Sequence, residues 1–262
     1  MLTMETISQY LASGQYFASS QPLTTAILAT GMAAIIVAYN DYRYYVSMGP
    51  HGLPDNWWGW YKQLRMSCKA RKDTTVPVPY DLAETAKTNG PNSTKSFFAR
   101  PLELRSGTRP EVCGFVAPQR QLTERCSDAM RRAMNAYLDN LVMDNAAILQ
   151  RENSKLEGPV PAVQLREGSP FPSFLEATRG EFVHIHPPDG STHLVLSLVD
   201  SAEAIEKGWG QRHRLSGGML TWGYTLIYAP RDEQDFHVWK NIVGAAANFS
   251  VAEIGQLRLP AD

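Results

Sequence analysis

The longest uninterrupted apolar run lies near the N-terminus. Residues 23–39, LTTAILATGMAAIIVAY, carry no charge, and seventeen residues at about 1.5 Å per residue just reach the lower limit for a bilayer span. Tyrosines, tryptophans and basic residues follow over 39–72, whereas residues 1–22 contain no Lys or Arg. This asymmetry predicts a membrane anchor over 1–40, single-pass or monotopic, with the rest of the chain facing the cytoplasm. A buried, Ala-rich helix is the alternative.

The remainder of the chain predicts two further segments. Residues 41–100 read as a juxtamembrane segment and linker, because 73–100 mixes Pro, Gly, Asn and Thr. Residues 101–262 have the pattern of a compact catalytic domain.

Within that domain, hydrophobic periodicity predicts alternating helices and strands. Apolar steps of three and four favour a helix over 120–150, and alternation favours strands over 159–165 and 220–229. A hairpin is expected at 181–187 and 191–198. Further helices are expected at 200–209, with Asp200 as N-cap and a stop at Gly208, and at 230–249, beginning at Pro230. This order predicts an α+β fold, an antiparallel sheet with helices packed on one face.

The hairpin contains three of the six histidines of the chain. Asp189-Gly190 between two apolar runs favours a two-residue turn, which would pair His186 with His193 and His184 with Val195. Because side chains alternate along a strand and paired residues share a face, all three imidazoles are expected on one side of the sheet. On the other side we expect the apolar residues Val183, Ile185, Leu194 and Leu196.

Three imidazoles on one face suit several chemistries. They could act as general bases and anion binders, or hold a divalent metal such as zinc or iron, or form an exposed polar face. No glutamate follows His186 at short spacing, which weakens a cupin-type metal site. The net charge of −1 excludes a general basic surface for nucleic acid, and three widely spaced cysteines indicate reduced thiols.

A second group of chemistry-bearing residues lies at 207–213, KGWGQRH, followed by LIYAPRDE at 226–233. We expect the first stretch to be a loop that closes over the histidine face. Arg231 is also open to a structural role, because it could cap the edge of the sheet or pair with Asp232 or Asp235. The candidate residues of these two stretches are Trp209, Gln211, Arg212, His213, Tyr228 and Arg231.

These two stretches resemble the fungal luciferase family, whose members oxidise 3-hydroxyhispidin. The likeness extends to HIH with THLVL at 184–186 and 192–196, to GTRP at 107–110, to QRQ at 119–121 and to DYRYYVSMGP at 41–50. It covers roughly residues 40–250, and KGWGQRH is its most specific part. The linker at 73–100 and the turn PPDGS depart from the luminous enzymes, which favours a non-luminous relative.

The resemblance implies a membrane-associated oxygenase that uses O2 without an organic cofactor, on an enolic α-pyrone or similar polyketide of fungal secondary metabolism. Such chemistry needs a base, cations for developing negative charge and a dry pocket. By residue type, a base is expected among His184, His186 and His193. Arg212 and His213 would hold anionic oxygens, and Trp209 and Tyr228 would wall the substrate.

Two other functions stay open at the level of sequence. One is a cofactor-free isomerase or cyclase that uses the same base. The other is a membrane-tethered protein that binds an apolar ligand without turnover, through its aromatic residues.

Overall fold

The computed structural model describes residues 3–49 and 51–260. The chain divides into two compact units, one ending at Ser47 and the other beginning at Met48. Of the expected juxtamembrane segment and linker, residues 41–100, positions 41–47 belong to the first unit and positions 51–100 to the second.

The first unit is helical. Helix α1 covers Met4–Ser20 and α2 covers Pro22–Ser47, so the expected apolar helix is present and is longer than predicted. Pro22 stands at the first position of α2, where the missing N–H costs nothing. The apolar side chains of α2 are exposed around the whole helix, among them Leu23, Ile27, Leu28, Met32, Ile35 and Val37. By length and composition α2 could cross a membrane.

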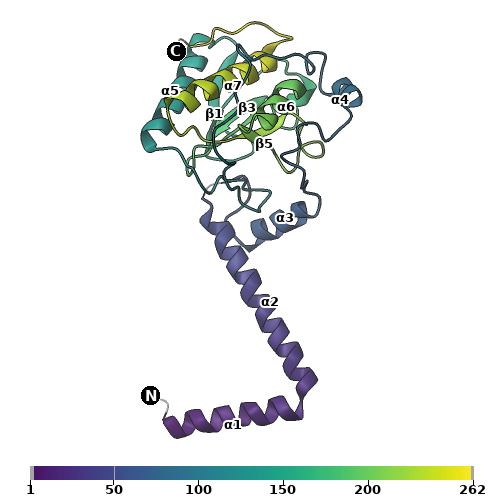
Figure 1. Ribbon diagram of the computed structural model, residues 1–262, viewed down its shortest axis with the longest axis vertical. Coiled ribbons are helices and arrows are strands. Elements are labelled where there is room, and N and C mark those ends of the chain that lie inside the picture. Colours follow the sequence, from purple (N-terminus) through teal and green to yellow (C-terminus); the bar gives the residue numbers. More distant parts are fainter. Residues whose placement is uncertain (1–2, 50, 261–262) are drawn as a thin grey trace. The chain divides into compact units, whose positions relative to one another are not determined.

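The second unit is built on one antiparallel sheet of six strands, in the order β1-β2-β3-β4-β6-β5 (Figure 1). The strands are β1 (Leu149–Asn153), β2 (Pro161–Leu165), β3 (Glu181–Ile185), β4 (Thr192–Val195), β5 (Gly210–Arg212) and β6 (Tyr224–Ile227). The α+β class predicted from the pattern is therefore correct.

Three helices cover one face of this sheet: α5 (Asp128–Asp144), α6 (Leu198–Glu206) and α7 (Glu233–Val251). The indole of Trp239 on α7 donates to Thr192 Oγ1 on β4 at 2.9 Å. The hydroxyls of Ser201 on α6 and Thr225 on β6 are 2.8 Å apart. Since paired residues share a face, Leu194, the partner of Thr225, also faces the helices.

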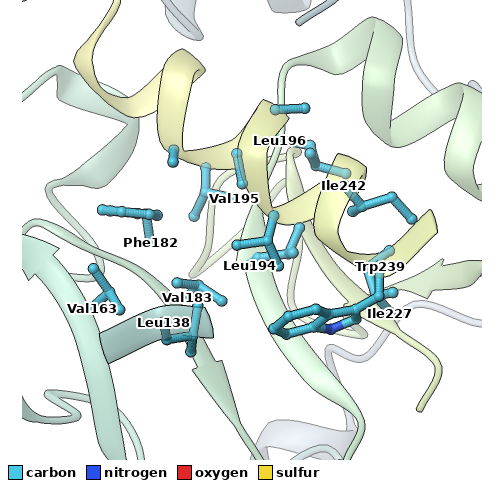
Figure 2. Packing of buried hydrophobic residues seen from close by; sticks show 14 of the residues in the cluster. Leu138, Val163, Phe182, Val183, Leu194, Val195, Leu196, Ile227, Trp239 and Ile242 are labelled. Atoms are coloured by element: carbon cyan, nitrogen blue, oxygen red, sulfur yellow. The ribbon is translucent and has the colours of Figure 1, made fainter. Parts of the chain in front are cut away.

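Apolar residues of the hairpin form the core beneath these helices. Val183, Ile185 and Leu194 belong to one buried cluster with Leu138 of α5 and Ile242 of α7 (Figure 2). The predicted split of the hairpin into an apolar face and a histidine face is confirmed. Burial of each such side chain contributes about 1.5–3 kcal/mol relative to its exposure.

The predicted two-residue turn is wrong. His184, rather than His186, pairs with His193, and Ile185 pairs with Thr192. Pro187 and Pro188 have no N–H with which to extend the ladder. The connection is therefore a longer loop, closed by hydrogen bonds from the His186 and Gly190 amides to Ser191 O and His186 O. The shift is two residues, so every side chain keeps its predicted face.

Several predicted element boundaries also change. Helix α5 begins only after its N-cap Ser127, and residues 149–150 of the predicted helix belong to β1. The N-cap of α6 is Ser197, whose hydroxyl accepts from the Asp200 amide. The predicted strand at 220–229 shortens to β6.

Asp200, the predicted N-cap of α6, binds a different part of the chain. Its carboxylate accepts hydrogen bonds from the Ser96 hydroxyl and the Phe97 amide, which fastens the segment before residue 100 to α6. The last helix, expected to begin at Pro230, begins at Glu233 with Asp232 as its N-cap, and Glu233 and Asp235 stand in its first turn. Gly208, at φ +85°, ends α6 as expected.

Two short helices precede the sheet in sequence, α3 (Trp57–Ser67) and α4 (Leu82–Thr88), and a 3-10 turn lies at Ser173–Leu175. Cys68, Cys113 and Cys126 are free, in keeping with the expected reduced thiols.

Candidate functional site

The three hairpin histidines form a buried cluster on the sheet face opposite the helices. His184 lies on β3, His193 on β4, and His186 directly after β3. Their ring centroids are 4.5–5.3 Å apart. All three are at most 2% exposed, so the alternative of an exposed polar face is wrong. The alternation of the two strands is what brings these rings together.

In each ring, the nitrogen that points away from the other two rings, here called the outer nitrogen, makes a hydrogen bond that holds the ring. His184 Nδ1 donates to Glu181 Oε1 at 2.5 Å, and His193 Nε2 lies 2.9 Å from Gln119 Oε1, an acceptor. His186 Nδ1 is 2.8 Å from Ser191 Oγ. That hydroxyl gives its only proton to the Asp189 carboxylate, so the imidazole is the donor.

The inner nitrogens of the three rings therefore face one another, and those of His186 and His193 carry lone pairs. His186 Nε2 and His193 Nδ1 are 3.2 Å apart. His184 Nε2 is buried and has no hydrogen-bond partner among the residues that the structure describes.

Glu157 supplies the fourth group. It stands in the loop between β1 and β2, where the Ser154 hydroxyl accepts from the Glu157 amide. Its Oε1 lies 3.7 Å from His184 Nε2, 3.5 Å from His186 Nε2 and 3.7 Å from His193 Nδ1. The four side chains place one ligand atom each within 4.8 Å of all the others.

A buried guanidinium fixes the carboxylate from outside. Arg120 Nη2 is 2.6 Å from Glu157 Oε2, and both residues are buried. The neighbouring residue, Gln119, holds His193. The segment that carries both is paired to the preceding chain by the Cys113 amide, which donates to Arg120 O.

Burial and charge set the protonation of the cluster. Burial by itself lowers the pKa of His184, but the carboxylates of Glu181 and Glu157 raise it to about 9. Burial lowers the pKa of His186, and burial with the neighbouring imidazoles holds that of His193 well below its usual value. Burial favours a neutral Glu157, yet Arg120 and the imidazoles hold its pKa well below its usual value.

A cavity of about 220 Å³ adjoins the cluster. Its polar end is formed by Glu157, His193, His213 and Tyr224. The rest of its wall is largely apolar and includes Leu53, Met66, Val116, Leu156, Leu215, Met219 and Leu220. An apolar cavity with a few convergent polar groups is the usual form of a small-molecule site.

His213 and Tyr224 extend the cluster into this cavity. The ring of His213 is 5.1 Å from that of His193 and 5.4 Å from that of Tyr224. His213 Nδ1 accepts from the Leu215 amide. Burial lowers the pKa of His213 to about 3 and raises that of Tyr224 well above its usual value. Both groups are therefore neutral near pH 7.

Arg212 is not part of this site. KGWGQRH contains strand β5, in which Arg212 pairs with Thr225 on the helix-covered face. Its guanidinium donates to the carbonyls of Val76 and Pro77. The residue was expected in a loop over the histidines, but alternation along a strand directs it to the opposite side of the sheet from His213.

The other expected binding residues also lie outside the cavity. Trp209 packs in the helix-side core and donates to Glu103 O. Gln211 accepts from the hydroxyl of Tyr228. Arg231 forms an ion pair with Asp235, the alternative that its sequence neighbours suggested.

Sequence reasoning missed Glu157, Glu181, Gln119, Arg120 and Tyr224 as site residues. Alternation in β3 by itself would place Glu181 with Val183 and Ile185 on the helix side. An irregular register between β2 and β3, where Val163 pairs with Val183 but Gln164 pairs with Glu181, brings it to the histidine side. Glu157 lies in an irregular segment 27 positions before His184, and no local pattern marks it. Arg120, 64 positions before His184, and Gln119 belong to QRQ at 119–121, and the likeness of that motif to the family was a signal that sequence reasoning did not use.

Comparison with known proteins agrees with the sequence resemblance. The luciferase domain family matches residues 179–246, which run from β3 to α7. Among curated proteins, a luciferase of Neonothopanus nambi is 26% identical over 87% of this chain and 86% of its own length. Luciferases of Armillaria ostoyae and Armillaria gallica are 27% and 26% identical, each over 87% of this chain and 88% of their own length. No solved structure matches the chain.

The family match covers all four histidines of the site, His184, His186, His193 and His213, together with Tyr224, while the matches to whole luciferases extend over most of the chain. Together with the shared motifs, these matches show that the chain is a relative of the fungal luciferases.

Proposed function

We propose that this protein is a membrane-associated oxygenase that acts, without an organic cofactor, on a small enolic molecule such as an α-pyrone or similar polyketide of fungal metabolism. The observation that supports this best is the cavity of about 220 Å³, which joins an apolar wall to the buried imidazole cluster. The relatives, named luciferases, favour an oxidation.

The groups at the polar end of the cavity suit formation of an enolate. His193 is the cluster imidazole that borders the cavity, and it is placed to take the proton of a substrate hydroxyl. The Tyr224 phenol lines the same end, where it can donate a hydrogen bond to the oxygen that becomes negative.

The reaction of the enolate with O2 then needs few further groups from the protein. The electron-rich enolate passes electrons to O2 and traps it as a peroxide on the substrate carbon. Ring closure of that peroxide and loss of carbon dioxide leave a ring-opened acid. The apolar wall, with Leu53, Val116 and Leu215 among its members, excludes the water that would compete for these intermediates.

Oxygen uptake by the purified full-length protein in detergent micelles tests this function, with 3-hydroxyhispidin as the probe. We expect uptake and release of carbon dioxide in equal amounts, and no turnover without oxygen. Leu215→Trp should raise KM or abolish uptake by filling the cavity, whereas Leu104→Trp, at a residue that is 75% exposed, should leave uptake unchanged.

The two alternative functions give different results in the same assay. Turnover that persists without oxygen would identify an isomerase or cyclase. Binding of the probe without any product, sensitive to Leu215→Trp, would identify a ligand-binding protein. Equal activity of the Leu215→Trp and Leu104→Trp variants would show that this cavity is not the substrate site.

The membrane is the proposed location because α2 exposes apolar side chains along its length. Exposed aromatic residues of α3, Trp57, Trp58 and Tyr61, are of the kind that favours a membrane interface. Basic residues follow α2 and none precedes it, which favours a cytoplasmic position for the unit that begins at Met48.

Protease digestion of microsomes that contain the full-length protein checks this orientation. We expect a C-terminal epitope to be digested without detergent, while a lumenal marker protein stays intact until detergent is added. Protection of the epitope to the same degree as the marker would reverse the proposed topology. Release of the protein by alkaline carbonate would contradict a spanning α2.

A further inference from the structure

The cluster of Glu157, His184, His186 and His193 has the features of a metal centre. Ligand atoms at about 2.0–2.2 Å from a shared tetrahedral centre are about 3.3–3.6 Å apart. Four of the six distances between the inner atoms are 3.2, 3.5, 3.7 and 3.7 Å, and the two between His184 Nε2 and the other imidazole nitrogens are within 4.8 Å. The spacing of the cluster therefore fits a single ion.

The hydrogen bonds of the three imidazoles also indicate a metal site. Each imidazole gives its outer N–H to Glu181, Ser191 or Gln119, an arrangement that fixes the tautomer of metal-ligating histidines. The inner lone pairs of His186 and His193 and a carboxylate oxygen of Glu157 then face one another, and His184 Nε2 becomes a third nitrogen donor when an ion displaces its proton. A cation among them would turn this repulsion into four bonds, and His184 Nε2, which lacks a hydrogen-bond partner among the described residues, would gain one.

The buried charge around the cluster is not balanced by the surrounding described residues. The carboxylates of Glu157, Glu181 and Asp189 are buried beside it, and the buried guanidinium of Arg120 pairs with Glu157. The pKa of His184 is raised to about 9, so its ring adds a second positive charge, and three negative charges against two positive charges leave an excess of one. Isolated buried charge is costly, and a divalent ion would neutralise it.

We propose that Glu157, His184, His186 and His193 bind one divalent ion of a first-row transition metal, beside the substrate cavity. Three imidazoles with one carboxylate favour zinc, iron, cobalt or nickel over magnesium or calcium, which prefer oxygen ligands throughout. Glu181, Ser191 and Gln119 are positioning residues that orient the rings.

The ion would lie next to the cavity, because Glu157 and His193 also line its wall. A cation there lowers the pKa of a hydroxyl that it binds. With an ion bound, His193 would promote loss of the substrate proton as a ligand, and without one it is the base of the proposed reaction. The inference concerns ion binding alone, and it does not depend on the proposed oxygenase reaction.

Cobalt binding to the full-length protein tests the site without any substrate. After treatment with a chelator and dialysis in micelles, the protein should bind one Co(II) per chain by elemental analysis. It should develop visible absorption bands of a bound ion, and its Tm should rise with Co(II) concentration. X-ray absorption of this complex should show imidazole scattering.

Variants separate this site from others. His184→Ala should weaken Co(II) binding by more than about 100-fold, and Glu181→Gln, which loosens one ring, by about 10–100-fold. His213→Ala is the matched control, a buried histidine that touches His193 but lies outside the ligand set, and should still bind one ion.

Three results would overturn the inference. The folded wild-type chain would bind no Co(II), or its complex would show oxygen ligands only. Alternatively, binding would survive His184→Ala and Glu181→Gln but be lost in His237→Ala, which would place the ion at an exposed histidine of α7. The wild-type measurements decide the question even if His184→Ala fails to fold. None of these results depends on oxygen uptake, so the two proposals fail separately.

Discussion

Replacement of His193 by alanine is expected to lower kcat/KM for oxygen uptake by about 10³-fold, the middle of the range for loss of a proton-transfer group. His193 is the hairpin imidazole that borders the cavity. Its ring also contacts His186, His213 and Tyr224. Its loss therefore removes the side chain against which these polar residues pack. Steady-state rates on an oxygen electrode give the measurement.

His237→Ala serves as the control for this variant, because His237 lies on α7 with its side chain 52% exposed. That variant should keep the wild-type kcat/KM. Circular dichroism should show that both variants retain the secondary structure of the wild type. A folded His193→Ala protein with wild-type oxygen uptake would remove the histidine cluster from the reaction.

Replacement of Arg120 by methionine is expected to lower the free energy of unfolding by about 3–5 kcal/mol, because it leaves the Glu157 carboxylate buried without its partner. Arg120 is 2% exposed and Glu157 is 7% exposed, so water does not compensate for the loss. In thermal unfolding the fall in Tm should be on the order of 10 °C. The intact protein in micelles, followed by tryptophan fluorescence, is suitable for this measurement.

A surface ion pair gives the comparison for Arg120. Arg131 and Asp128 are one turn apart at the start of α5, with side chains 28% and 76% exposed. Arg131→Met should cost less than about 1 kcal/mol, since water and salt screen such a pair. Equal losses in the two variants would contradict a special role for burial at Glu157.

Most of the fold of the second unit could be predicted from local patterns. Periodicity located α5, α6, α7 and the strands β2, β3, β4 and β6, because each buries one face and shows that in its sequence. It did not find β1 and β5. Both stand at the edges of the sheet, and β5 has only three residues, too few for alternation to be visible.

The candidate site could be predicted only in part, and the reason is geometrical. The side chains of His184 and His193 share a face whether the turn has two residues or four, because the predicted and the observed registers differ by two residues. Arg212 was misplaced because a stretch rich in Gly and polar residues was interpreted as a loop. As a strand, it directs Arg212 and His213 to opposite faces.

By itself, the sequence determined the α+β class, the apolar and histidine faces of the hairpin, an apolar helix long enough to cross a membrane, and the resemblance to fungal luciferases. These follow from the period of local patterns and from motifs within a few residues. Only the tertiary structure decided that Glu157, Gln119 and Arg120 meet the histidines. Their meeting depends on how loops far apart in sequence cross the open face of the sheet, and no local period encodes that.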